Sequence, residues 1–223
     1  MYVDSYCERT APGLWNEPAN AVSNLAFLAA SALLLWLLAG QRHRVPVSVW
    51  LLPVLLGIVG LASLAFHTVA TRLTSALDSL AILLFVLVGV AVVLHWMWRV
   101  RWRWAWLAAP AFLGFAVGLN LLLYAAGGER ATVGGYAPAL AGLAALGLAV
   151  RFTAPPDAAR FGGWLLGAAA LFTASLTLRT LDGPLCADLP VGTHFLWHCL
   201  NATVLFLVSY AVLRRWQQTV APR

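Results

Sequence analysis

The sequence predicts an all-α membrane protein with seven transmembrane helices in a single domain. Its 223 residues are 62% hydrophobic and only 10% charged, whereas charged residues make up about 25% of an ordinary soluble domain. The apolar residues gather in segments of about 20 residues, the length at which a helix crosses a bilayer. These segments are 21–40, 47–66, 76–96, 104–125, 134–152, 161–179 and 193–213. No linker or repeat divides the chain, so 1–223 is predicted to be one domain.

Residues 1–20 are predicted to form an extramembrane leader before the first span. The leader is acidic and polar and lacks the basic start of a secretory signal peptide, so the first apolar segment is expected to be a retained helix. Asn20, Ser23 and Asn24 follow as a polar stripe at helical spacing. In a membrane helix such groups face protein or a cavity, and hydrogen bonds between helices explain them without any chemistry.

The arginines predict the orientation of the chain in the membrane. All 14 basic residues are arginine, and the seven predicted spans divide them unevenly between the two sides. One side carries Arg42, Arg44, Arg99, Arg101, Arg103, Arg151, Arg160, Arg214, Arg215 and Arg223, and the other carries Arg9, Arg72, Arg130 and Arg179. The positive-inside rule places the first group in the cytoplasm, so the N-terminus is expected outside and the C-terminus inside. Arginine without lysine, together with many alanines, suggests a GC-rich bacterial genome and therefore the bacterial inner membrane.

The basic net charge of the chain does not indicate binding to nucleic acid. The formal net charge is +6, and tryptophans alternate with arginines across residues 96–106. This stretch borders two predicted spans, where an interfacial aromatic belt is expected. No nucleic-acid partner is therefore predicted, and nothing in the sequence indicates an obligate protein partner.

Two histidines open the last apolar segment. His194 and His198 are four residues apart, so in a helix both imidazoles project from one face. Two such nitrogens can hold one metal ion, although helical histidine pairs at this spacing also arise without function. Within a membrane segment, buried polar side chains are expensive and usually functional, which favours the metal. A third ligand must then come from another helix.

Three more polar residues are expected at the same depth of the bilayer. Ser63 and His67 lie four apart at the end of the second predicted span, and Asp78 lies at the start of the third. Because successive spans run in opposite directions, these residues and the histidine pair should converge in the outer half of the membrane. Three neutral imidazoles with one open position are typical of a catalytic zinc site. Alternatively, Asp78 is the fourth ligand of a closed, structural zinc site.

This set of residues predicts metal-assisted hydrolysis of an amide or ester. Zinc lowers the pKa of its bound water to about 7 and polarises a carbonyl group. Asp78 could orient or deprotonate that water, and Ser63 could donate a hydrogen bond to the oxyanion. Since the site lies among apolar helices, the expected partners are the membrane and a lipid substrate that enters from it.

The leader holds further candidates. Glu8 and Glu17 could share a hard cation such as calcium, or they could belong to a solvated leader in which Glu17 favours the helix dipole. Cys7 and Cys186 both fall on the predicted outer side, where an oxidising compartment would allow a disulfide; the alternative is two free thiols. Cys199 is interpreted as a small packing residue.

Together these motifs resemble a known family. Ser63-xxx-His67, Asp78 and His194-xxx-His198 on seven membrane helices resemble the CREST superfamily of membrane hydrolases. The leader sequences Tyr-Cys-Glu-Arg and Trp-Asn-Glu-Pro-Ala-Asn-Ala-Val-Ser-Asn-Leu resemble those of the alkaline ceramidase family and its bacterial relatives. The similarity runs from the leader to the last span, but residues 95–180 carry no usable motif.

The resemblance implies a zinc-dependent intramembrane ceramidase. It implies that His67, His194 and His198 bind zinc, with Ser63 and Asp78 beside them. The implied reaction is cleavage of a ceramide amide to a sphingoid base and a fatty acid by attack of a zinc-bound water. The alternative is a receptor-like or regulatory member of the superfamily, or a structural zinc site, without significant ceramidase activity.

The resemblance also implies a calcium ion in the leader. In the family pattern Glu8 and Glu17 match acidic ligands, and Tyr6 and Thr10 match backbone contributors. Ser5 stands where the family has an aspartate, with Asp4 one residue earlier. Ser79 follows Asp78 where animal enzymes usually have glutamate. The serine at position 5 weakens the prediction of calcium binding, and Ser79 weakens the prediction of the substrate.

Overall fold

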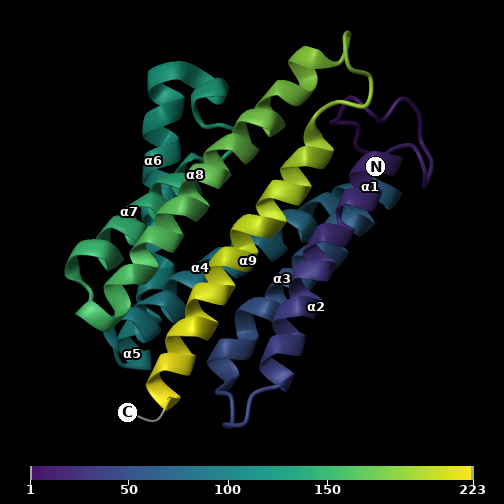
Figure 1. Cartoon of the computed structure of the whole chain (residues 1–223). Coiled ribbons are helices and arrows are strands. Elements are labelled where there is room, and N and C mark those ends of the chain that lie inside the picture. The colour runs from purple at the N-terminus through teal and green to yellow at the C-terminus, as the bar shows by residue number, and fades with distance from the viewer. Residues whose placement is uncertain (1, 222–223) are drawn as a thin grey trace.

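The structure, a computed structural model that describes residues 2–221, is helical along most of its length (Figure 1). Its elements are α1 (Pro18–Ser23), α2 (Leu25–Ala39), α3 (Val47–Val69), α4 (Arg72–Trp98), α5 (Trp102–Ala105), α6 (Ala108–Ala131), α7 (Ala137–Thr153), α8 (Pro156–Leu185) and α9 (His194–Val220). No strand occurs within the described residues, where Tyr2 and Thr71 form only an isolated bridge. The predicted all-α class is therefore confirmed.

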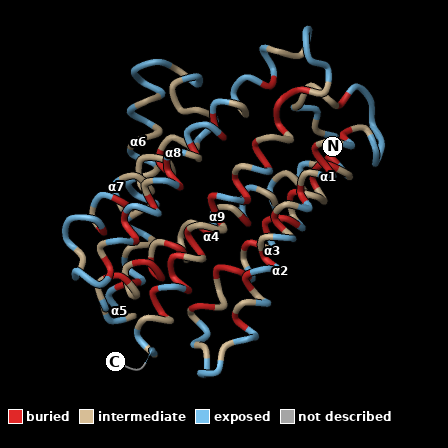
Figure 2. The backbone as a smooth tube through the Cα atoms, viewed as in Figure 1, coloured by how far each residue is buried: buried red, intermediate tan, exposed pale blue. Residues whose placement is uncertain are grey.

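Six helical stretches are long and apolar enough to cross a membrane. They are α1 with α2, α3, α4, α5 with α6, α8 and α9. The fifth predicted span, 134–152, corresponds to α7, which is apolar but has only 17 residues. Large apolar side chains remain exposed on the outer faces of the long helices, and α6 buries none of its residues (Figure 2). Such a surface suits lipid rather than water, so the chain is a multi-pass integral membrane protein.

Helix α9 lies at the centre of the bundle. It packs against α1, α2, α3, α4 and α8, while α7 packs against α8, and α6 packs against α4 and α7 (Figure 1). The buried stretches of the chain follow the inward faces of these helices (Figure 2). The core includes Leu52 and Leu56 of α3, Phe161 of α8 and Trp216 of α9. Because α9 contacts helices from both halves of the chain, residues at its start can meet partners from α1 and α3.

The ends of several helices differ from their prediction. Helix α1 begins at Pro18, so the leader is shorter than the predicted 1–20. Helix α8 begins at Pro156 and continues to Leu185, so it extends beyond both ends of the predicted span 161–179. Residues Val133, Gly134 and Gly135 have positive φ angles and form a turn, which delays α7 to Ala137. An apolarity pattern does not detect polar residues that extend a helix beyond the membrane.

The C-terminal part of α9 is also helical beyond its predicted end. Arg215 lies in the C-terminal tail that follows the last predicted span (193–213), but it is buried and pairs with Asp157 of α8, with 2.7 Å between Arg215 Nη1 and Asp157 Oδ2. Its Nε donates to the carbonyl of Trp96. A buried charge with these partners holds the helix in place beyond the apolar segment. Arg223, assigned to the same tail, lies outside the described residues.

Candidate metal centre

Three buried histidines meet at one end of the bundle. His67 lies near the end of α3, and His194 and His198 lie in the first two turns of α9. One ring nitrogen from each lies within 4.8 Å of the other two, and each residue is at most 2% exposed. The ring centroids are 4.6 Å apart for His67 and His198, and 4.6 Å apart for His194 and His198. Among the described residues, this is the group able to hold a metal ion.

Hydrogen bonds to the Nδ1 atoms fix the orientation of two of the histidines. His67 Nδ1 is 2.5 Å from the Glu17 carboxylate, and His198 Nδ1 is 2.7 Å from the hydroxyl of Ser23. Each contact leaves the Nε2 atom of the ring as the available ligand. A metal-ligating histidine ordinarily has its other nitrogen held in this way, which sets the tautomer. The polar stripe predicted in the first helix thus faces protein, and its Ser23 orients one of the histidines.

Unpartnered nitrogens supply an independent test of metal binding. His67 Nε2 and His194 Nδ1 are buried and have no hydrogen-bond partner among the described residues. A buried polar atom left unsatisfied costs about 1–3 kcal/mol. A cation shared by these nitrogens would remove that cost, and three neutral imidazoles are a donor set that zinc prefers. The residues therefore fit the predicted zinc ion.

Asp78 and Ser63 lie beside this cluster but outside it. Asp78 is not part of the group of mutually close ligand atoms. Its Oδ1 atom is buried and has no hydrogen-bond partner among the described residues, and Ser63 lies next to its carboxylate. A carboxylate in this position is available to accept a proton. The geometry thus favours Asp78 as a base over Asp78 as a fourth ligand.

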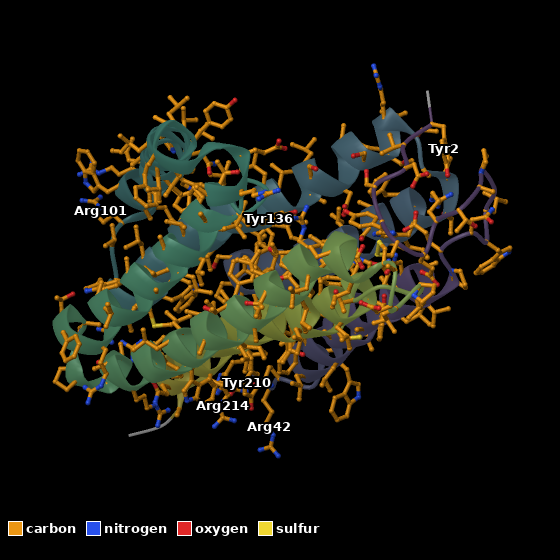
Figure 3. All side chains as sticks on the ribbon, turned by 90° about the horizontal axis from the view of Figure 1, so that it is seen from above. Tyr2, Arg42, Arg101, Tyr136, Tyr210 and Arg214 are labelled. Atoms are coloured by element: carbon orange, nitrogen blue, oxygen red, sulfur yellow. A yellow bond between two sulfur atoms is a disulfide. The ribbon has the colours of Figure 1, made fainter. Side chains whose placement is uncertain are left out.

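A polar cavity lies beside the histidines, and one of its lining residues also lines an apolar cleft. The cavity has a volume of about 310 Å³, and its lining includes Asp78, Tyr6 and Tyr136. Tyr6 stacks on His194 with 3.7 Å between ring centroids, which places the cavity against the histidine cluster. Tyr136 also lines a narrow apolar cleft between α4, α7 and α9 that continues to Val208. Figure 3 shows Tyr136 near the middle of the bundle.

Arg179 was not predicted as part of the site. Its guanidinium lies over the rings of Tyr136 and Trp197, at 4.9 and 5.8 Å from their centroids. It also lines the polar cavity, together with Asp78. The cavity therefore combines a cation, a carboxylate and a phenol above an apolar cleft, the pattern expected for binding an amphiphile.

No protein-family model matches this chain, and no curated protein matches it. Support for a function therefore comes from the residues of the site. A cluster of three buried histidines beside a carboxylate, a polar cavity and an apolar cleft can together hold a metal ion and an amphiphilic ligand.

Asp182 joins three parts of the chain at the start of α9. Its Oδ1 accepts hydrogen bonds from the backbone N–H groups of Thr193 and His194, at 2.7 and 2.9 Å, and its Oδ2 accepts from that of Cys7, at 3.1 Å. A carboxylate at a helix N-terminus is also favoured by the helix dipole. Gly192 has a φ of +67°, and a Cβ there would collide with Asp182. This arrangement fixes the first turn of α9 and with it His194.

A disulfide strengthens the same junction. Cys7 and Cys186 are bonded, with 5.2 Å between their Cα atoms, so the first of the two alternatives for these cysteines holds. The bond ties the leader to the end of α8, next to Asp182. Cys199 is free and exposed rather than packed inside.

Asp182→Ala is expected to lower the free energy of unfolding by about 2–4 kcal/mol, because three backbone donors lose a charged acceptor. Denaturant unfolding of the purified protein in detergent, followed by tryptophan fluorescence, measures the loss. Asp188→Ala is the matched control, since Asp188 is exposed six residues away and its change should stay within about 0.5 kcal/mol. Equal losses in the two variants would contradict the role of Asp182.

The leader residues predicted to bind calcium have other partners. Glu8 accepts from the backbone N–H groups of Ala19 and Asn20, at 2.6 and 2.8 Å, and so caps α1. Glu17 accepts from Arg9, Asn20 and His67. Tyr6 stacks on His194, whereas Ser5 and Thr10 are exposed. Nitrogen groups already occupy the carboxylate oxygens of Glu8 and Glu17, so these residues do not fit calcium.

The electrostatics of the leader follow from these contacts. Burial alone would raise the pKa of Glu17, but its hydrogen bonds with His67 and Arg9 outweigh burial and hold that pKa below its ordinary value. Glu17 is therefore a carboxylate that orients His67. Burial raises the pKa of the Tyr6 phenol. Tyr6 thus keeps its proton and can donate a hydrogen bond into the polar cavity.

Proposed function

We propose that this chain is a zinc-dependent intramembrane hydrolase of the alkaline ceramidase type. It cleaves the amide bond of a ceramide-like lipid to a sphingoid base and a fatty acid. One observation carries the proposal: three buried histidines lie beside a polar cavity lined by Asp78, and Tyr136 lines both this cavity and an apolar cleft. A catalytic zinc site needs three protein ligands and an open position, and a lipid amide needs a polar place for its head beside an apolar place for its chain.

The residues divide the chemistry among them. Zinc, when bound, supplies a Lewis acid that polarises the amide carbonyl and makes water more acidic. Asp78 accepts a proton from the attacking water as the C–O bond forms, and it returns the proton to the amine as the C–N bond breaks. Ser63 donates a hydrogen bond to the oxygen that becomes negatively charged. Glu17 and Ser23 hold two of the histidines in position, and the apolar cleft holds the acyl chain.

The proposal includes a seven-span topology in the bacterial inner membrane. The 17 residues of α7 extend about 25 Å, near the lower limit for a span, and α7 packs beside α6 and α8. An odd number of spans agrees with termini at opposite ends of the bundle (Figure 1). Arg42, Arg101 and Arg214 are exposed at the edge of the bundle (Figure 3), which supports an inside C-terminus. The Cys7–Cys186 disulfide supports a periplasmic site.

Turnover of a long-chain ceramide by the purified protein in detergent or nanodiscs tests this function. Release of both a sphingoid base and a fatty acid, identified by mass spectrometry and abolished by a zinc chelator, is expected. A folded, zinc-containing protein that hydrolyses no ceramide would contradict the proposal and favour a regulatory role.

Val90→Trp tests where the acyl chain lies. Val90 lines the apolar cleft on α4, twelve residues deeper than Asp78 along the helix. A filled cleft should lower turnover of long-chain relative to short-chain substrates about tenfold, as steric discrimination in apolar pockets allows. Leu84→Trp, on the exposed face of α4, should leave this ratio unchanged. Equal effects of the two substitutions would place the acyl chain elsewhere.

A further inference from the structure

Arg9 is a buried cation in the leader. The exposed fraction of its side chain is 0%, although the residue belongs to a loop before the first helix. Its Nε pairs with the Glu17 carboxylate. Its two remaining nitrogens donate to the carbonyl oxygens of Gly13 at 3.2 Å and of His67 at 2.9 Å. The guanidinium therefore connects the leader, the start of α1 and the end of α3.

These contacts place Arg9 behind the metal centre. The Oε1 atom of Glu17 accepts a hydrogen bond from Arg9, and its Oε2 atom is hydrogen-bonded to His67 Nδ1. A buried carboxylate stays charged only where positive charge and hydrogen bonds compensate it. Arg9 supplies both to Glu17, and it also binds the backbone oxygen of the residue that Glu17 orients. The position of the His67 imidazole thus depends on the guanidinium through two separate contacts.

The leader offers few free oxygen ligands to a divalent cation. Calcium takes six to eight oxygen ligands, yet both oxygens of Glu8 cap α1 and both oxygens of Glu17 are occupied by nitrogen donors. Ser5 offers a hydroxyl group where the resemblance expects a carboxylate. Two positive charges a few ångströms apart also repel each other strongly in a buried environment. Arg9 and calcium are therefore alternatives at this site.

We propose that Arg9 is the built-in cation of the leader and replaces calcium there. The guanidinium organises Glu17 and the end of α3, so the chain folds and holds its metal without calcium. Arg9 is a positioning residue: it acts on His67 through Glu17 and through the His67 carbonyl. The inference depends on the proposed function only if lipid turnover is the quantity measured. Folding, calcium binding and zinc affinity can each be measured without a lipid substrate.

The wild-type protein gives the first test. After treatment with EGTA, calorimetric titration with calcium should show no binding at millimolar concentration, and calcium should leave the melting temperature unchanged. Calcium binding with a rise of several degrees in melting temperature would overturn the proposal. This measurement needs no variant and does not depend on the identity of the lipid substrate.

Arg9→Met gives the second test. Zinc affinity, measured by competition with a chelator, should fall about tenfold, in the range seen when groups that orient metal ligands are removed. Arg130→Met is the matched control because Arg130 is exposed on the same predicted side. Arg9→Lys should recover part of the zinc affinity by restoring the charge. Unchanged affinity in Arg9→Met, or no recovery in Arg9→Lys, would overturn a charge-based positioning role.

The two proposals can fail separately. A protein that binds zinc, ignores calcium and hydrolyses no ceramide leaves the role of Arg9 intact and contradicts the proposed function. A ceramidase whose folding or zinc retention requires calcium contradicts the role of Arg9 and leaves the proposed function intact.

Discussion

His198→Ala is expected to reduce bound zinc from about one ion per chain to almost none and to abolish lipid hydrolysis. Three protein ligands are the usual number at a catalytic zinc site, and two neutral imidazoles hold the ion far less tightly. His198 is the suitable ligand to remove because its ring is held by Ser23 alone among the side chains, whereas His67 is also tied to the ion pair of Glu17 and Arg9. Elemental analysis and turnover of the same dialysed samples measure both quantities.

The control for this variant is His43→Ala. His43 is exposed in the loop between α2 and α3, and its loss should change neither zinc content nor turnover. Circular dichroism checks that His198→Ala remains helical, because loss of a bound ion also lowers stability by mass action. Zinc retained at the wild-type level in folded His198→Ala would refute the three-histidine site.

The histidines of the centre could be predicted because their signal is local. His194 and His198 are related by helical spacing, and Ser63 and His67 by the same spacing on the second span. Alternation of the spans then brings the two pairs to one depth whatever the details of packing. Apolar length likewise indicated the helices, since a membrane allows few other backbone arrangements.

The groups that orient the histidines could not be predicted in the same way. Glu17 reaches His67, and Asp182 reaches the start of α9, only because the leader folds back over the ends of α3 and α9. That path depends on Arg9, which binds the carbonyl of a residue 58 positions away. No periodic pattern relates such positions. From the sequence alone, Arg9 therefore contributes only a charge to the prediction of membrane topology.

Two residues of the polar cavity could not be predicted for a different reason. Tyr136 and Arg179 belong to the part of the chain in which no motif was found. Tyr136 precedes α7 after a turn, and Arg179 lies in the last part of α8, at the end of the apolar segment. Their proximity follows from packing of α7 against α8. An isolated tyrosine and an isolated arginine carry no signal until that packing is known.

Asp78→Asn is expected to lower the rate of lipid hydrolysis about 10²–10⁴-fold, the usual contribution of a general base, while zinc content stays at the wild-type level. Asparagine has nearly the same shape as aspartate but cannot take a proton from water. Asp78 is suited to this role because its Oδ1 is buried without a hydrogen-bond partner among the described residues and it lines the polar cavity. Turnover at saturating substrate, with zinc measured on the same preparation, separates the base from a metal ligand.

Asp188→Asn removes an exposed carboxylate from the loop before α9 and should leave both turnover and zinc content unchanged. Loss of zinc in Asp78→Asn would show that Asp78 is a fourth ligand. A closed, structural zinc site would then be the better interpretation. Wild-type turnover in Asp78→Asn would contradict a role for Asp78 in proton transfer. Only a slow variant that still holds its zinc agrees with three histidines as ligands and Asp78 as the base, because that result alone separates binding of the metal from transfer of the proton.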